Sequence, residues 1–375
     1  MMEEPAVRCN RIQVNDFRNI QAADVCFAPG INILAGKNAQ GKTNLLEAIS
    51  YISIGKSFRT PHDEALIRFG AECAQVSLDF TDSLRDQNLT VRMMAGKRRR
   101  IEHNHVKVGK VSDIVGQFRT VLFCPEHLSL IKDGPSERRN YLDVAISQLY
   151  PLYLKSLQRY NQILKQRNQL IKRAPEDMKT FRDTIEFWSS QLAHEAAVIS
   201  FYRHRYLKQA EEAISSCFAE MTDGRETPTV IYAGSSKQPD EEYTDQKHTE
   251  EVYLHLLSTR HDREIGAGST LYGIHKDDID ICLNGASARL YASQGQQRSL
   301  ALAMKLAEGE VCSRICGELP VFLFDDVFSE LDENRRAYLS EKIVGKQVII
   351  TSCDPNCVGN ANLITVENGV YHSSK

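Results

Sequence analysis

The sequence predicts an α/β protein in which a mixed sheet and a phosphate-binding loop form a nucleotide-binding core, interrupted by a helical insertion. A loop containing Lys42 lies early in the chain, and an apolar strand ending in Asp325 lies late in it. The separation is 325 − 42 = 283 residues, far more than one strand–helix repeat. We therefore expect a discontinuous head over residues 1–125 and 265–375. Residues 126–264 are expected to form the insertion, a helical lobe or short antiparallel helical arm.

Composition places the chain among ordinary soluble globular proteins. It has 375 residues, of which 42% are hydrophobic and 25% charged, so two domains or one domain with a large insertion is expected. The net charge of −3 excludes a generally basic nucleic-acid coat, and any DNA contact must come from local patches. No run of about 20 apolar residues and no secretory signal is present, which predicts a protein without a membrane partner. Ten scattered cysteines without a C-x-x-C pair indicate reduced thiols and a cytoplasmic location.

The phosphate-binding loop has the spacing G-x-x-x-x-G-K-T and a suitable context on both sides. Residues 31–35 predict a strand entering it, and residues 44–52 predict a helix leaving it. Glycines let the backbone turn its N–H groups towards phosphate oxygens, and the helix N-terminus adds positive potential. Lys42 would reach the β- and γ-phosphates of ATP, and the Thr43 hydroxyl would bind Mg²⁺. The alternative is a Gly-containing turn that matches by chance. The loop consists of Gly36, Lys37, Asn38, Ala39, Gln40, Gly41, Lys42 and Thr43.

The regions around this loop have the alternating pattern of strands. Residues 8–30 predict a strand pair, and residues 74–80 and 89–94 predict two further strands. A dense basic run, Lys97 to Arg100, follows. It is either a solvated hairpin tip or a contact with a nucleic-acid backbone.

The insertion has the rhythm of long helices. Between residues 136 and 173 the apolar residues recur at gaps of three and four, and Pro151 should kink or restart this helix. A second stripe covers residues 181–206. Together they predict an antiparallel hairpin whose arms, each of nearly 40 residues, would span at most about 60 Å. An ordinary two-helix layer packed on a globular domain is the alternative. Residues 222–251 are polar, and the middle of this stretch predicts a loop or a poorly ordered segment.

The second half of the nucleotide site is the apolar strand of residues 321–325, which ends in two carboxylates. Asp325 would hold the magnesium ion, and Asp326 would act as the base that polarises the attacking water. The two carboxylates could instead form a strand-end turn or a helix N-cap. The phosphate loop in the same chain disfavours that interpretation.

A second anion-binding device precedes this strand. Ser293, Gly295 and Gln296 open the apolar helical segment of residues 300–311. A hydroxyl, a flexible backbone and a helix dipole then point in one direction. Taken alone, the pattern could equally be a plain helix N-cap.

The order of these motifs resembles the ABC-type ATPase heads of the SMC and double-strand-break-repair class. In that class the signature serine, here Ser293, contacts the γ-phosphate held by a second subunit, so that ATP joins two heads. The segment of residues 329–332 matches the loop that crosses the dimer interface. Ser352 stands where ABC transporters usually have a switch histidine, so such a switch is absent. No clear glutamine matches the loop that couples magnesium to the helical lobe, which would fall near Pro125 and Glu126.

Within that class, the chain resembles the RecF family of bacterial recombination-repair ATPases. The matching stretches run from residue 15 to residue 332 and so cover nearly the whole chain. They are residues 15–19, 36–43, 125–128, 138–143, 293–298 and 325–332.

This resemblance implies a cytoplasmic, ATP- and Mg²⁺-dependent DNA-binding protein with weak, DNA-stimulated ATPase activity. It would dimerise on ATP at gapped or single-strand/double-strand junction DNA and help RecO and RecR to load recombinase during repair, replication restart and SOS induction. Slow hydrolysis would time its dissociation. The resemblance also adds Arg18 and Asn19 to the ATP-binding residues.

Four other interpretations compete with this one. A transporter subunit is disfavoured because the insertion is too long and no membrane partner segment is present. A true SMC or double-strand-break protein needs a coiled coil of hundreds of residues plus a hinge or C-x-x-C motif, and this chain has neither. Another SMC-like repair ATPase, or a nucleotide-dependent scaffold without turnover, stays open.

Overall fold

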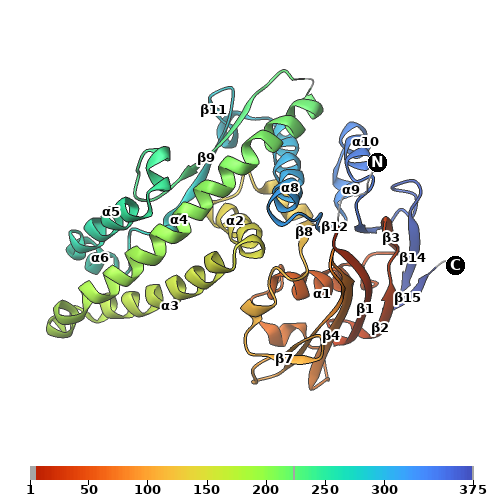
Figure 1. Ribbon diagram of the computed structural model, residues 1–375, viewed down its shortest axis with the longest axis horizontal. Coiled ribbons are helices and arrows are strands. Elements are labelled where there is room, and N and C mark those ends of the chain that lie inside the picture. The colour runs from red at the N-terminus through yellow and green to blue at the C-terminus, as the bar shows by residue number, and fades with distance from the viewer. Residues whose placement is uncertain (1–5, 223, 374–375) are drawn as a thin grey trace. The chain divides into compact units, whose positions relative to one another are not determined.

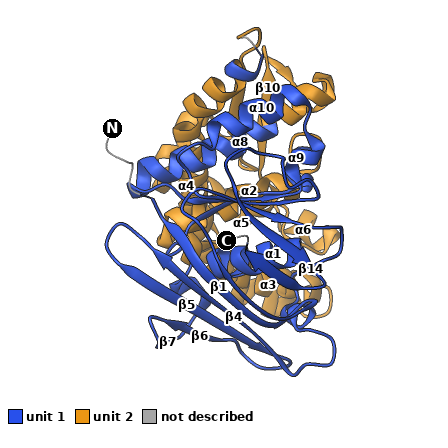
Figure 2. Ribbon diagram, turned by 90° about the vertical axis from the view of Figure 1, so that its right-hand side faces the viewer, with its two compact units in different colours: residues 1–129, 220–223, 301–375 blue, residues 130–219, 224–300 orange. Residues whose placement is uncertain are grey.

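A computed structural model describes residues 6–222 and 224–373. The chain forms two compact units (Figure 2). Unit 1 comprises Met1–Ser129, Glu220–Asp223 and Ala301–Lys375, and unit 2 comprises Leu130–Ala219 and Gly224–Leu300. The sequence-based boundary assigned residues 265–300 to the head. In the structure they lie in unit 2, because their main strand pairs with a strand of the insertion.

The first sheet of unit 1 has the order β15-β14-β3-β13-β12-β8. The strands from β14 to β8 are parallel to their neighbours, and β15 is antiparallel to β14, so the predicted mixed sheet is confirmed. The buried strands are almost entirely apolar, as expected of parallel strands covered on both faces. The bounds are β3 (Ile31–Ala35), β8 (Thr120–Phe123), β12 (Val321–Asp325), β13 (Val348–Ser352), β14 (Asn362–Glu367) and β15 (Val370–Ser373).

The second sheet of unit 1 is antiparallel, with the order β2-β1-β4-β5-β6-β7. Its strands alternate buried and exposed residues, which matches a sheet with one face on the core. The predicted strand pair in residues 8–30 is confirmed as β1 and β2. The bounds are β1 (Arg8–Phe17), β2 (Ile20–Cys26), β4 (Cys73–Thr81), β5 (Asp86–Met94), β6 (Arg100–His103) and β7 (Val106–Val108).

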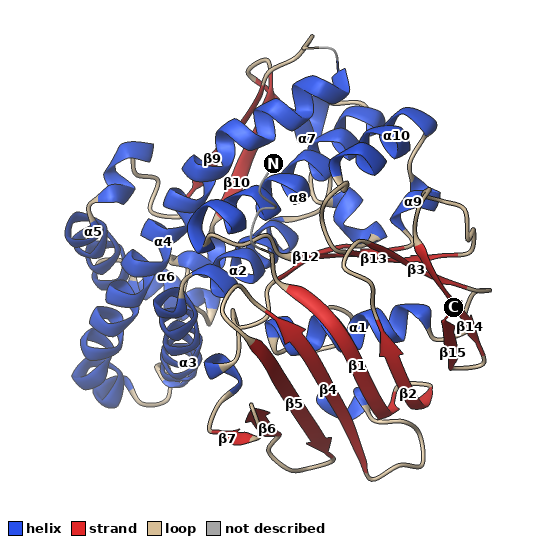
Figure 3. Cartoon of the chain, turned by 45° about the vertical axis from the view of Figure 1, so that its right-hand side comes forward, coloured by secondary structure: helices blue, strands red, loops and turns tan. Residues whose placement is uncertain are grey.

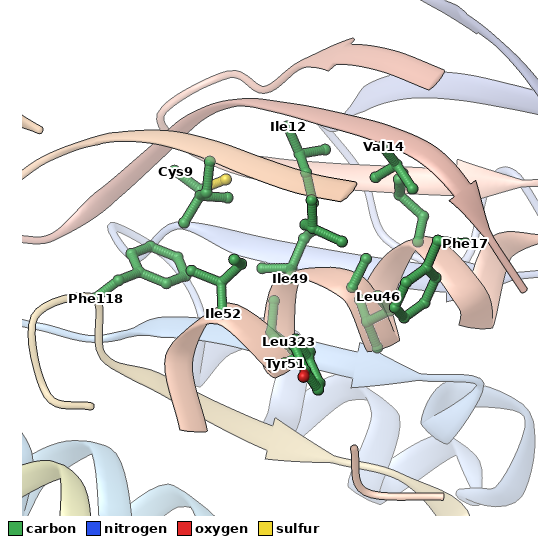
Figure 4. Close-up of a cluster of buried hydrophobic side chains, with 14 of the residues drawn as sticks. Cys9, Ile12, Val14, Phe17, Leu46, Ile49, Tyr51, Ile52, Phe118 and Leu323 are labelled. Atoms are coloured by element: carbon green, nitrogen blue, oxygen red, sulfur yellow. The ribbon is translucent and has the colours of Figure 1, made fainter. Parts of the chain in front are cut away.

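Helix α1 (Lys42–Ile54) lies between the two sheets of unit 1 (Figure 3). Ile49 and its neighbours on α1 pack against Ile12 of β1 on one side, while Leu323 of β12 lies on the other (Figure 4). A helix that is apolar on most of its circumference must be covered on several sides. Full burial of one aliphatic side chain stabilises a fold by about 1.5–3 kcal/mol, so this packing fixes α1 and the loop at its N-terminus.

Unit 1 also contains α9 (Val327–Glu330) and α10 (Glu333–Lys342). Helix α8 (Gln294–Cys316) begins in unit 2 and ends in unit 1. All ten cysteines are free thiols. Every helix in the described ranges is too short or too polar to traverse a lipid bilayer.

The helical hairpin of unit 2 consists of α3 (Pro151–Arg173) and α4 (Met178–Thr222), preceded by α2 (Pro135–Leu149). The predicted restart is confirmed, since Pro151 is the first residue of α3. The two helices are antiparallel, because Tyr153 bonds to Arg203 while Arg167 bonds to Ser189. Because the chain breaks between α2 and α3, the first arm of the hairpin is α3 alone, with 23 residues rather than the expected length of nearly 40.

Two further helices cover part of the hairpin, as Figure 1 shows for α5 (Gln246–Ser258) and α6 (His261–Ala267). His194 of α4 contacts Glu250 of α5 at 2.9 Å, and Phe181 packs edge-on against His261. Of the two interpretations left open, a layer packed within a globular unit fits better than a bare arm.

The expectation of a loop in the middle of residues 222–251 is confirmed over residues 234–239, which lie outside helices and strands, but regular structure flanks this loop on both sides. Residues Pro228–Ala233 form β9, which pairs antiparallel with β10 (Asp278–Leu283). Buried side chains alternate along both strands, so one face of this small sheet packs against the rest of unit 2. A short β11 (Ala286–Ser287) and α7 (Ala288–Tyr291) complete the unit.

A buried ion pair joins three helices of unit 2. Arg167 of α3 donates to both carboxylate oxygens of Glu264 on α6, at 2.6 and 3.0 Å, and both side chains are fully buried. It also donates to Ser189 of α4 at 3.2 Å. Such a pair holds its elements in register, and loss of one partner leaves the other charged and uncompensated.

We predict that Glu264→Gln destabilises unit 2 by about 3–5 kcal/mol, because Arg167 would keep its charge without a carboxylate. Trp188 on α4 is the only tryptophan, so its fluorescence during urea unfolding reports on unit 2. The matched control is Lys208→Gln, which breaks a half-exposed pair with Asp240 and should cost about 1 kcal/mol or less. Equal midpoints for the two variants would contradict the assigned role of the buried pair.

Candidate nucleotide-binding site

Three neighbouring parallel strands bring the predicted site together at their carboxyl ends. The phosphate loop follows β3, Asp325 ends β12, and β13 lies between these two strands. Polar groups at the carboxyl edge of a parallel sheet are the usual place for a ligand. The motifs from the two ends of the sequence therefore meet in unit 1.

The backbone of the loop requires its glycines. A Cβ atom on Gly36 would lie 2.3 Å from the carbonyl oxygen of Val366, and Gly41 has a φ of +109°. Gly41 also caps α1 without any side-chain acceptor, and the first turn of α1 has no acidic residue. The N–H groups and the positive end of the helix dipole are thus left to an anion such as a phosphate.

Lys42 is almost fully buried, and its ammonium group is held over the loop. Its Nζ donates to the carbonyl oxygens of Gly36 at 2.5 Å and Lys37 at 2.9 Å. In the described chain it forms no ion pair with a carboxylate. A buried cation that is balanced only by carbonyl dipoles is well suited to the negative charge of a nucleotide phosphate.

Thr43 and Asp325, the two predicted metal ligands, lie in direct contact. The Thr43 hydroxyl donates to Oδ1 of Asp325 at 2.7 Å, and the Thr351 hydroxyl of β13 donates to the same oxygen at 2.7 Å. Burial raises the pKa of Asp325, although the bonds from Thr351 and Thr43 act in the opposite direction. Sequence reasoning missed Thr351, although a polar residue that ends an apolar strand is a recognisable signal.

These oxygens fit a magnesium ion. Mg²⁺ prefers oxygen ligands, and it usually takes one or two carboxylates, retained waters and substrate phosphates. Thr43 and Asp325 would hold the ion, which would supply positive charge to balance the phosphates.

Asp326, the predicted base, begins α9 in a left-handed conformation with φ of +52°. Its backbone N–H donates to the Thr351 hydroxyl at 2.9 Å, so the same threonine fixes both carboxylate-bearing residues. Aspartate tolerates this conformation better than most residues, and strained backbone often marks functional positions.

The glutamine of the loop that couples magnesium to the helical lobe would fall near Pro125 and Glu126. These residues lie in a 3₁₀ turn, Pro125–Ser129. Glu126 is exposed, and its negative charge contributes to the raised pKa of Asp325. Ser352 occupies the position of the switch histidine, and the next residue is Cys353. The thiol of Cys353 lies 3.8 Å from Nζ of Lys42 and donates to Asn38 at 3.0 Å.

Arg18 and Asn19 lie in the tight turn between β1 and β2. Arg18 makes a two-pronged contact with Glu47 of α1, at 2.7 and 2.9 Å, so its guanidinium anchors this turn to the helix. Asn19 donates to the carbonyl of Ala39 at 3.4 Å and accepts from Asn44 at 2.6 Å. Nucleotide binding by these two residues stays a prediction.

The β14–β15 hairpin supports the loop from behind, which the sequence did not indicate. The backbone N–H of Gly369 donates to the carbonyl oxygen of Gln40 at 3.0 Å, and Asn368 donates to the side chain of Gln40 at 2.5 Å. The hydroxyl of Tyr371 donates to the carbonyl oxygen of Gly41 at 3.0 Å. The side chain and the carbonyl oxygen of Gln40 are therefore engaged by protein, and its backbone N–H is the group that could donate to a phosphate.

The residues predicted to act on a second subunit form the start of α8 in unit 2. Ser293 is exposed; its hydroxyl accepts from the N–H of Gln296 at 3.3 Å, and Gln296 accepts from the N–H of Ser293 at 2.6 Å. This reciprocal pair is a capping box, so the N-cap alternative describes the single chain correctly. Gln296 also donates to Glu226 at 2.5 Å. Gly295, between them, is partly exposed. Contact with a second subunit stays a prediction.

We predict that Tyr371→Phe raises the dissociation constant for ATP about two- to tenfold, because loss of one hydrogen bond of about 0.5–1.5 kcal/mol leaves the loop less ordered. Isothermal titration with ATP measures this, and the melting temperature should barely change. The control is Tyr338→Phe, which removes a hydroxyl that bonds to Glu220 in the same unit. Unchanged affinity in Tyr371→Phe would show that the hairpin does not organise the loop.

Comparison with known proteins agrees with this geometry. The sequence profile described as the RecF/RecN/SMC N terminal domain matches residues 8–374. "DNA replication and repair protein RecF" of Staphylococcus epidermidis is 36% identical over 370 residues, covering 97% of this chain and 99% of that protein. Its counterpart from Thermoanaerobacter pseudethanolicus is 38% identical over 357 residues, covering 95% of this chain and 97% of that protein.

Solved structures give the same result. The recombination mediator protein RecF-ATPrS of the RecFOR pathway matches with a TM-score of 0.93 and 33% identity, covering 100% of both chains. An Smc head domain derived from Pyrococcus furiosus, 17% identical, matches with a TM-score of 0.57 over 98% of this chain and 96% of that chain, and shares the fold. The ABC-type ATPase head that the sequence predicted is thus confirmed, and the chain belongs to the RecF family.

Proposed function

We propose that this chain is an ATP-dependent recombination mediator that dimerises around ATP on gapped or junction DNA. The observation that carries the proposal is the pairing of Thr43 with Asp325 beside a buried, carboxylate-free Lys42. This arrangement suits the triphosphate of ATP together with Mg²⁺. The relatives named above, described as a DNA replication and repair protein and as a mediator of the RecFOR pathway, support the biological setting.

Dimerisation is proposed from the exposure of Ser293 and the start of α8. Ser293 and Gln294 are exposed at the start of a helix of 23 residues, whose dipole favours an anion at this end. A second copy could present its ATP phosphate to this helix end. The nucleotide would then be shared, and each site would be completed by the other subunit.

Hydrolysis is proposed to end the assembly rather than to drive movement. Asp326 would orient and deprotonate the attacking water, and Lys42 would offset the charge that develops on the phosphate. We propose that turnover is weak and stimulated by DNA. RecO and RecR are the proposed protein partners. With them the chain would help to load recombinase during repair, replication restart and SOS induction. The proposed location is the cytoplasm.

The experiment that tests the function is sedimentation with and without ATP, repeated with single-stranded, duplex and gapped DNA. We expect a monomer without nucleotide and a dimer with ATP, and the largest shift with gapped DNA. A monomer under every condition would overturn the dimer proposal. Equal binding to all three DNAs would overturn the preference for gaps or junctions.

We predict that Ser293→Arg abolishes the ATP-dependent dimer and leaves ATP binding to the monomer intact, because a bulky cation would block the docking of a second copy. Sedimentation and ATP titration read the two effects separately. Gln246→Arg places the same side chain at the exposed start of α5 and should dimerise normally. Ser293→Ala isolates the lost cap, which costs about 0.5–2 kcal/mol of stability. An unchanged sedimentation profile for Ser293→Arg would refute the model.

We predict that Asp326→Asn lowers the ATP turnover rate roughly 10²-fold or more, because an amide cannot accept the proton of the attacking water. ATP binding should persist, and the dimer should dissociate more slowly. Phosphate release and sedimentation measure these effects, with Asp24→Asn on the exposed strand β2 as the control. Wild-type turnover in Asp326→Asn would remove this residue from the role of base.

A further inference from the structure

Helix α3 in unit 2 has an exposed face without a carboxylate. The chain contains 49 Asp and Glu among 375 residues, yet residues 144–175 contain none. Apart from Pro151 and Leu152 at its start, the exposed side chains of α3 are cations or amides. The cations are Lys155, Arg159, Lys165, Lys172 and Arg173, and the amides are Gln158, Asn161, Gln162, Gln166 and Gln169. We call this surface the α3 cationic face.

These positions lie on one side of the helix. With 3.6 residues per turn they share one continuous arc, while Tyr153, Tyr160 and Arg167 are buried on the opposite side. The pattern therefore belongs to a surface and does not merely reflect the local composition. From Lys155 to Lys172 the separation is 172 − 155 = 17 residues, about 25 Å along the helix, or about seven base-pair steps of duplex DNA.

Most of this charge is not neutralised within the protein. Arg159 lies 3.5 Å from the carboxylate of Glu195 on α4, so its charge is partly balanced. Lys155, Lys165 and Lys172 make no ion pair with any described carboxylate. Lysines in a row repel one another, and this repulsion is offset only by water or by a bound anion.

We propose that the α3 cationic face binds the phosphate backbone of duplex DNA. Lysines supply the charge that displaces counterions, and glutamine and asparagine amides donate hydrogen bonds to phosphate oxygens. A single strand is the weaker match, because sites for it usually offer aromatic platforms for the bases, and both tyrosines named above are buried. The inference rests on the proposed DNA-binding function and adds the surface that carries it.

The basic run at residues 97–100 suits this role less well. Arg99 bonds to the carboxylate of Asp63 and to the carbonyl of Gly55, so it stabilises unit 1. Lys97 and Arg98 share a surface hollow with Asp63 and Glu64, whose negative charges would oppose phosphates. The α3 cationic face has no such neighbours along its own helix.

The test is a triple variant, Lys155→Gln, Lys165→Gln and Lys172→Gln. Glutamine already occupies neighbouring positions and has a helix propensity close to that of lysine, so α3 should persist. Affinity for a fluorescently labelled duplex is measured with ATP at several salt concentrations between roughly 50 and 200 mM. We expect binding at least about tenfold weaker, and a slope of log affinity against log salt that is smaller by about 3.

The matched control removes the same charge elsewhere on unit 2, with Lys237→Gln, Lys247→Gln and Lys276→Gln, all at exposed positions. It should keep the wild-type affinity and slope. A second variant, Gln162→Lys with Gln169→Lys, adds charge to the α3 cationic face and should tighten binding and steepen the slope.

The outcomes separate the two proposals. If the wild-type chain with ATP binds no DNA, the proposed function fails. If it binds duplex DNA, but the triple variant matches the control and the added lysines change nothing, the α3 cationic face is not the DNA site. If only single-stranded binding changes, the assignment to duplex DNA is overturned.

Discussion

One hydrogen bond, from the Thr43 hydroxyl to the Asp325 carboxylate, joins the two halves of the nucleotide-binding head. The bond is 2.7 Å long, and its partners are 282 residues apart in sequence. It can form only if β3 and β12 end at the same edge of the sheet, with one strand between them. That intervening strand supplies Thr351, which bonds to the same carboxylate oxygen and to the backbone of Asp326. Sheet order, loop conformation and carboxylate position are thus mutually dependent.

Burial of α1 provides the rigidity that this arrangement needs. The helix that starts at Lys42 is packed between two sheets, and Arg18 ties the β1–β2 turn to its buried Glu47. The β14–β15 hairpin holds the carbonyls of Gln40 and Gly41 from the other side. A preorganised loop loses little freedom when it binds an anion, so more of the interaction energy appears as affinity.

Unit 2 combines an interior held by buried ion pairs with one exposed helix face, on α3, that carries no carboxylate. Its helices are fixed by buried charges, among them Arg167 with Glu264 and Arg203 with Asp277. These pairs keep Glu264 and Asp277 buried. The exposed side of α3 contains no acidic residue at all. The same helix can therefore supply a structural cation inwards and, in our proposal, a DNA-binding row of cations outwards.

The sequence by itself determined the local chemistry. The phosphate loop, the strand with two carboxylates, the restart at Pro151 and the predicted strands rest on short-range spacing, which local backbone physics enforces. Tertiary structure decided the rest, because these features depend on contacts between distant residues. It decided that Thr351 and Tyr371 support the site, that β9 pairs with β10 and so draws residues 265–300 into unit 2, and that α5 and α6 cover the hairpin. The periodicity of α3 predicted its buried side, but only the observed burial and ion pairs separated Arg159 and Arg167, which meet carboxylates, from three lysines that do not.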